Sequence, residues 1–89
     1  MNTLFLLMAQ YGGQVIIPLK VVCDDYFSLT EDNFKRKVAL GDIDIPIVQV
    51  ESSQKSARGV HVKDLAAYLD KQHRSAREDH ERLHGRKAG

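Results

Sequence analysis

Polar side chains after Thr30 have the types and spacing needed to contact nucleic acid. Thr30, Asn33, Arg36 and Lys37 recur at helical intervals and carry hydroxyl, amide, guanidinium and ammonium donors. Arginine and asparagine can each bond two acceptors on a base edge, and lysine pairs with phosphate. Charged residues on an amphipathic helix are also its ordinary solvated face, and this group alone favours that plainer interpretation.

A second group of donors lies in a polar stretch between two β-prone runs. From Ser52 to Lys63 the chain has basic residues and no acidic one. Such a loop can follow a phosphate backbone or enter a minor groove, although a mobile surface loop has the same composition. The two groups together favour nucleic acid. The candidate contacts in this loop are Ser53, Gln54, Lys55, Ser56 and Arg58.

Other reactive side chains favour structural roles. His80 and His84 have the i, i+4 spacing of a metal pair, but no cysteine lies nearby to complete a site. Cys23 falls on an apolar stripe and is expected in the core, and Asp24 with Asp25 is expected at a surface or in an ion pair. We therefore expect no metal, no cofactor and no catalytic residue.

Length and composition indicate one small domain. The 89 residues include 13 basic and 12 acidic side chains, so net charge alone does not indicate the kind of partner. A single cysteine excludes an intramolecular disulfide and fits a reducing, cytoplasmic setting. The apolar run Leu4 to Ala9 lacks a basic leader, and no run reaches the length of a membrane span. We expect a soluble protein with no membrane contact.

The N-terminal segment allows two interpretations. Residues 3–11 (TLFLLMAQY) and the run Val15 to Ile17 flank Gly12 and Gly13, which favours two strands of a hairpin. Leu, Met, Ala and Gln also form helices well, so a short helix is the alternative. Several large side chains are expected in the core here and in the next segment: Phe5, Met8, Tyr11, Tyr26 and Phe27.

Two helices should follow. Apolar residues recur at helical spacing from Pro18 to Phe27, and Pro18 suits a first helical turn. Either Ser28 with Glu31 forms a capping box or Thr30 caps alone, and the second helix should end at Gly41.

The last part of the chain predicts a hairpin and a charged helix. Residues 47–50 and 59–62 are short and β-branched, and residues 65–69 begin an amphipathic helix. The charged tail 71–87 can stay helical through ion pairs, and residues 85–89 should be disordered. We predict a domain at 1–73 and a charged helical extension with a disordered end at 74–89.

This order predicts an α+β fold, a small winged helix-turn-helix of the MerR or excisionase kind, with an N-terminal strand or short helix added and a charged C-terminal helix.

The sequence also resembles a known family. The strings NTLFLLMAQYGGQVIIP, VCDDYFSLT, GDIDIPIV and SQKSARGVHVKDLAAYLD are similar to pyocin activator proteins of the PrtN type, from Asn2 to about Arg82. The resemblance implies a transcriptional activator that binds DNA upstream of bacteriocin or phage-tail-like genes. A looser similarity to excisionase and MerR-type domains, over Ile17 to Leu69, implies that the second helix enters the major groove and the wing touches the adjacent backbone.

We therefore expect a sequence-specific DNA-binding activator that is not an enzyme. Its partner would be double-stranded promoter DNA, with RNA polymerase and a second copy of the chain as further candidates. Two rivals stay open: an excisionase-like architectural protein, and an adaptor that recruits a partner protein through Leu4 to Tyr11.

Overall fold

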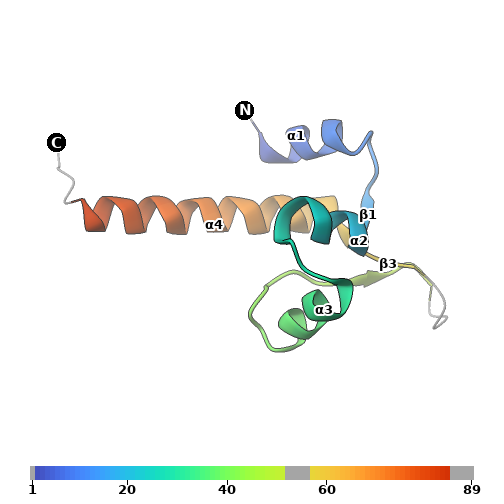
Figure 1. Ribbon diagram of the computed structural model, residues 1–89. Coiled ribbons are helices and arrows are strands. Elements are labelled where there is room, and N and C mark those ends of the chain that lie inside the picture. The colour runs from blue at the N-terminus through green and yellow to red at the C-terminus, as the bar shows by residue number, and fades with distance from the viewer. Residues whose placement is uncertain (1, 52–56, 85–89) are drawn as a thin grey trace.

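The computed structural model describes residues 2–51 and 57–84 (Figure 1). In chain order the elements are α1 (Thr3–Gln10), β1 (Ile16–Pro18), α2 (Leu19–Val22), the π-helical turn η1 (Cys23–Phe27), α3 (Glu31–Ala39), β2 (Val48–Gln49), β3 (Arg58–His61) and α4 (Val62–Leu83).

The three strands form one antiparallel sheet in the order β1-β3-β2. Ile17 lies opposite Val60 in one pair, and Gln49 lies opposite Arg58 in the other. Gly59 permits the close approach of β1, since a Cβ atom there would lie 2.5 Å from the carbonyl oxygen of Ile17. The central strand thus joins the hairpin to the N-terminal half of the chain.

The preference for a strand at residues 3–11 is wrong, because this segment forms α1. The Asn2 side-chain oxygen accepts a hydrogen bond from the Leu4 amide at 2.7 Å, which caps the helix start. Gly12 and Gly13, both with positive φ, end the helix and turn the chain. The hairpin expected around these glycines is also wrong, because β1 pairs with β3 instead.

The helix expected from Pro18 begins one residue later. Pro18 ends β1 and occupies the N-cap of α2, rather than the first helical turn. The helical path then continues through η1, where the spacing widens to a π turn. It ends at Ser28, whose φ of 54° is in the left-handed region and reverses the chain toward α3.

The predicted second helix is confirmed as α3. Thr30 caps it alone, since its hydroxyl oxygen accepts from the Asn33 amide at 3.2 Å. Gly41, with a φ of 84°, follows the helix end as the sequence indicates. The hairpin is confirmed as well, with β2 and β3 as its two antiparallel strands.

Helix α4 begins where β3 ends. His61 closes the strand, and its Nδ1 accepts from the Lys63 amide at 3.0 Å, so this residue caps the helix. The first part of α4 is buried against the body, and α1 lies beside it, with the Thr3 hydroxyl donating to Asp70 at 2.6 Å. The helix continues to Leu83 without a break, which confirms the helical prediction for residues 71–83 of the charged tail.

The core is formed by buried side chains from every element except β2, together with Ile43 and Ile45 of the link between α3 and β2. The side chains with less than 2 % exposure are Phe34, Ile17, Leu19, Ile45, Leu65, Val22, Val60 and Cys23. The expectation that Phe5, Met8 and Tyr26 are core is wrong, since they are 69 %, 39 % and 37 % exposed. Only one side of α1 can pack on the body, and Leu7 takes that place.

The molecule is therefore a small α+β protein. Figure 1 shows α1 on one side of α4, and α3 with the hairpin on the other side. The boundary expected between residues 73 and 74 falls within α4 and stays a prediction, and residues 85–89 lie outside the described chain.

Candidate nucleic-acid interface

The exposed face of α3 is held by a buried aromatic contact. Phe34 is fully buried, and its ring meets that of Phe27 edge-on, with the ring centroids 5.0 Å apart. Phe27 also contacts Tyr68 of α4, with the ring centroids 5.7 Å apart. An edge-to-face pair adds about 0.5 to 1.5 kcal/mol beyond its buried area. The orientation of α3 is thereby fixed relative to η1 and α4.

Two of the four candidate contacts on α3 are joined by a side-chain hydrogen bond. An Nη2 hydrogen of Arg36 is donated to the Asn33 side-chain oxygen at 3.0 Å, and both residues are exposed. A guanidinium has five N–H donors, so Arg36 keeps others for a ligand. The Thr30 hydroxyl accepts the capping bond, and Lys37 is half-buried beside this pair. Arg36 is thus the most available cation of the four predicted residues.

Charge is unevenly distributed along α3. Glu31 and Asp32 occupy the first turn, where acids complement the helix dipole, and Arg36 and Lys37 occupy the last turn. Lys35 pairs with Asp32 at 3.8 Å across the middle. An anion would therefore approach the second half of this helix and avoid its start.

Only one of the predicted hairpin contacts lies within the described residues. Arg58 is the first residue of β3 and is exposed, opposite Gln49 in the register. Ser53, Gln54, Lys55 and Ser56 lie outside the described residues. Figure 1 shows α3 and the hairpin on the same side of α4, away from α1. The roles of all nine residues stay predictions.

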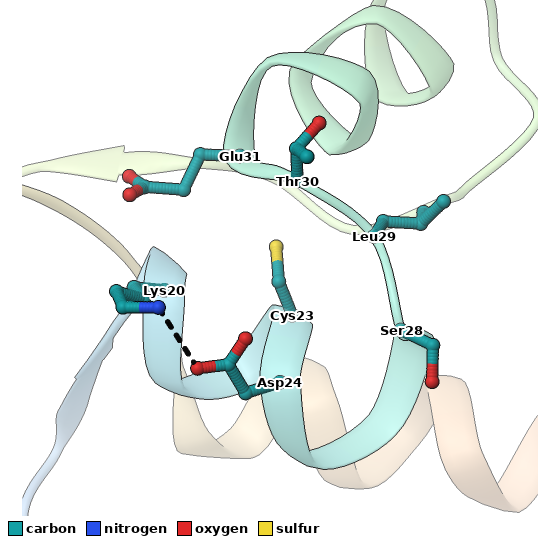
Figure 2. Close-up of a pocket in the computed structure, with 7 residues that line it drawn as sticks. All are labelled: Lys20, Cys23, Asp24, Ser28, Leu29, Thr30 and Glu31. Atoms are coloured by element: carbon teal, nitrogen blue, oxygen red, sulfur yellow. Dashed lines mark hydrogen bonds and ion pairs between the residues drawn. The ribbon is translucent and has the colours of Figure 1, made fainter.

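A pocket of about 530 Å³ lies at the crease between the α2–η1 segment and the start of α3. Its lining is Lys20, Cys23, Asp24, Ser28, Leu29, Thr30 and Glu31 (Figure 2). The ammonium of Lys20 pairs with Asp24 at 3.2 Å, as the ion-pair interpretation of Asp24 requires. The Cys23 thiol points from η1 toward Thr30 and Glu31.

The electrostatics of this pocket oppose nucleophilic chemistry at Cys23. The thiol is buried, as the sequence predicts, and burial raises its pKa, with further contributions from the Glu31 and Asp24 carboxylates. A raised pKa keeps the thiol protonated at neutral pH, whereas a nucleophilic cysteine needs a lowered one. Cys23 therefore fits the structural role that its apolar stripe indicates.

The remaining ionisable candidates are engaged in local contacts. Asp25 accepts a hydrogen bond from the Tyr11 hydroxyl at 2.7 Å and so ties η1 to α1. The rings of His80 and His84 lie 4.4 Å apart, as their spacing predicts. Within residues 2–51 and 57–84 no cluster of three or more His, Cys, Asp or Glu side chains could hold a metal ion.

Two features of this region were not anticipated from the sequence. The i, i+4 spacing of Lys20 and Asp24 is visible in the sequence, but the pocket beside them depends on how α3 returns over η1. The bond between Arg36 and Asn33 follows an i, i+3 spacing that the sequence also shows. Helical spacing is the sequence signal that could have predicted the Lys20–Asp24 pair and the Arg36–Asn33 pair, whereas the pocket had no such signal.

Comparison with known proteins gives one match. The family described as Pyocin activator protein PrtN matches residues 3–76. No curated protein and no solved structure matches the chain. Among the helices of the described residues, none is both long and apolar enough to cross a membrane.

Proposed function

The chain belongs to the pyocin activator protein PrtN family, and we propose that it acts on its target genes by binding double-stranded DNA through α3 and the β2–β3 hairpin. In this proposal the protein is a winged helix-turn-helix. The α2–η1 segment is the first helix, α3 enters the major groove, and the hairpin is the wing that follows the neighbouring backbone. The target would be a promoter element upstream of bacteriocin or phage-tail-like genes.

The exposed Arg36 carries this proposal. It stands on a helix anchored by Phe34, and its bond to Asn33 aligns two side chains that can each read a base edge. The buried Phe34 anchors the helix that carries both residues, so binding would not need to order this helix first. Arg58 supplies a further cation at the base of the hairpin.

Fluorescence anisotropy tests the proposal directly. Labelled promoter fragments from upstream of the host's pyocin-type genes are titrated with the full chain at several salt concentrations, with random duplex as competitor. We expect tighter binding to one fragment and a linear fall of log K with log salt concentration. Absence of binding to every duplex at low salt would contradict the proposal.

Two α3 variants separate base contacts from general charge. Arg36→Ala should lose about 5- to 150-fold in affinity on the cognate fragment, corresponding to about 1 to 3 kcal/mol, and should discriminate less against random duplex. Lys35→Ala is the matched control. It removes a cation from the same helix, but one that already pairs with Asp32. This variant should change the affinity for the cognate fragment and the affinity for random duplex by the same factor.

The hairpin is tested separately. Lys55→Ala should weaken binding to all duplexes similarly and flatten the salt dependence, since a phosphate contact carries no sequence information. Strong DNA bending by several contiguous copies, without an effect on transcription, would favour the excisionase-like alternative.

One observation supports a protein partner as the second candidate function. The outward side of α1 exposes Phe5 and Leu6, at 69 % and 53 %, and the helix has no charged residue. Exposed apolar surface of this kind often marks a protein contact. If the full chain binds no duplex, an adaptor that uses α1 becomes the leading interpretation.

A further inference from the structure

Two histidine side chains lie together at the far end of α4. His80 and His84 are both exposed, and Figure 1 shows this end of the helix projecting past the other elements. The ring centroids are 4.4 Å apart, and the ring planes are tilted by 44°. The His84 amide donates to the His80 carbonyl oxygen at 3.0 Å, so one closed helical turn separates the two residues. The pair therefore lies side by side and is open to a ligand.

The separation of the rings fits two imidazoles bound to one metal ion. A metal–nitrogen bond to histidine is about 2.0 to 2.1 Å long, so rings at neighbouring positions of a tetragonal ion have their centroids about 4.5 Å apart. The His80 and His84 rings already lie at this separation. Residues four apart on a helix share one face, which keeps both rings on the same side of α4. One ion can thus join both rings while the backbone stays helical.

The number of ligands indicates which metal fits. A structural zinc site uses four protein ligands, and the described residues place no third metal-binding side chain beside this pair. Copper(II) and nickel(II) form tetragonal sites of nitrogen and oxygen ligands, and water can take the positions that the protein leaves open. Of the divalent first-row metals, copper(II) binds such nitrogen ligands most tightly. A pair of imidazoles with open positions therefore favours copper(II).

The charged side chains around the pair do not oppose a cation. Arg77 lies one turn before His80 on a neighbouring part of the helix surface, and its guanidinium pairs with Glu81 at 3.6 Å. Asp79 and Arg82 pair with each other. Each nearby positive charge is thus matched by a negative one, and the exposed setting screens both pairs. The imidazoles are left as the groups that select the ligand.

We propose that His80 and His84 form a copper(II) site in which the two rings take neighbouring positions and water takes the others. Each histidine binds as the neutral imidazole, which has a free lone pair on one ring nitrogen. The ion clamps the last turn of α4, because both rings can reach it only while this turn is helical. The proposal rests on α4 alone and does not depend on DNA binding.

Isothermal titration calorimetry of the full chain with copper(II), in a buffer that does not bind metals, tests the site. We expect the tightest event to take up one ion per chain. His80→Ala and His84→Ala should each weaken this event by at least about 10-fold, since the second ligand on a helix acts at a high effective concentration. A smaller loss in either variant would overturn the proposal. Uptake of one ion per two chains would overturn the single-chain site.

Two controls separate pairing from the number of histidines. His73→Ala removes an exposed histidine of the same helix whose neighbours four residues away are Leu69 and Arg77, so the affinity should stay unchanged. The double variant Ser75→His with His84→Ala keeps the number of histidines but leaves no two of them three or four residues apart. It should bind as weakly as His84→Ala alone. Binding as tight as the wild type would overturn the proposal.

Electron paramagnetic resonance counts the nitrogen ligands of the bound ion. The wild type should give a spectrum with two equatorial nitrogens, and His84→Ala a spectrum with one. A single nitrogen in the wild type would overturn the proposal. Magnesium prefers oxygen ligands and serves as the control ion, so an excess of it should leave the copper(II) spectrum unchanged.

Amide hydrogen exchange tests the clamp. Copper(II) should slow exchange at residues 80–84 of the wild type and leave the same residues of His84→Ala unchanged, because a ligand that binds only the helical turn stabilises it. Both histidines are exposed, so the variant should keep the body folded. Equal exchange in the wild type with and without copper(II) would overturn the clamp.

Discussion

Helix α3 and the second half of α4 both expose charged side chains, but only α3 is anchored. Phe34 fixes α3 to the body, and Thr30 caps its start. From Lys71 to His84 α4 and its cap bury no residue. An anchored helix presents its donors in a fixed geometry, which suits a rigid ligand such as duplex DNA. The second half of α4 is held by its continuity with the buried first half and by the ion pair of Lys71 with Asp44 at 3.6 Å. The two regions therefore differ in how firmly they hold their charged side chains.

Truncating the anchor should have the largest effect. Phe34→Ala removes a fully buried ring and its contact with Phe27, so the free energy of unfolding should fall by about 3 to 5 kcal/mol. Leu83→Ala, on the projecting half, should change it by no more than about 0.5 kcal/mol, because this side chain is 79 % exposed. Urea denaturation of each variant gives the comparison. Similar losses in both would mean that the projecting half is as anchored as α3.

Removing the cap of α3 should have an intermediate effect. Thr30→Ala leaves the Asn33 amide without its side-chain partner, which costs about 1 kcal/mol. Thr30→Ser keeps the hydroxyl and serves as the control, so it should stay close to the wild type in the same denaturation experiment. If the serine variant lost as much stability as the alanine variant, the hydroxyl would not be the source of the effect.

Removing the hydrogen bond between Tyr11 and Asp25, which links α1 to η1, should have the smallest effect on the free energy of unfolding. Burial and the Asp25 carboxylate raise the pKa of Tyr11 above its ordinary value of 10.0, so the fold favours the neutral phenol. The stabilisation is complete below pH 10 and declines as pH rises beyond that value. Tyr11→Phe removes a partly exposed hydrogen bond worth about 0.5 kcal/mol and should lose this alkaline dependence.

Urea denaturation of the wild type and of Tyr11→Phe, at a series of pH values from 7 to above 10, checks the direction of this pH dependence. The difference in free energy of unfolding between the wild type and Tyr11→Phe should shrink as the pH rises above 10. A difference that grows with pH would mean that the fold favours the phenolate and would contradict this account of Tyr11.

Local signals in the sequence predicted α3 well and α1 poorly. Thr30 marks the cap of this helix, the buried Phe34 marks a core position, and Gly41 marks the helix end. Each of these signals depends on near neighbours in the sequence. Residues 3–10 are apolar almost throughout, so periodicity could not separate strand from helix, and the Asn2 cap decided in favour of helix. The strand preference failed for that reason.

Long-range features could not be read from the sequence. Pairing of β1 with β3 joins residues more than 40 positions apart, and the need for Gly59 appears only once Ile17 lies beside it. The spacing of His80 and His84 is visible in the sequence, but their exposure depends on where the body ends. The same limit applies to the candidate site, because spacing placed Arg36 outward but did not place it relative to Arg58.

Amide hydrogen exchange of the full chain, with and without duplex DNA, tests the division between the two regions most directly. We expect bound duplex to slow exchange in residues 31–39 and in β3, and to leave residues 71–84 unchanged. Slower exchange confined to residues 71–84, with none in α3, would contradict the account.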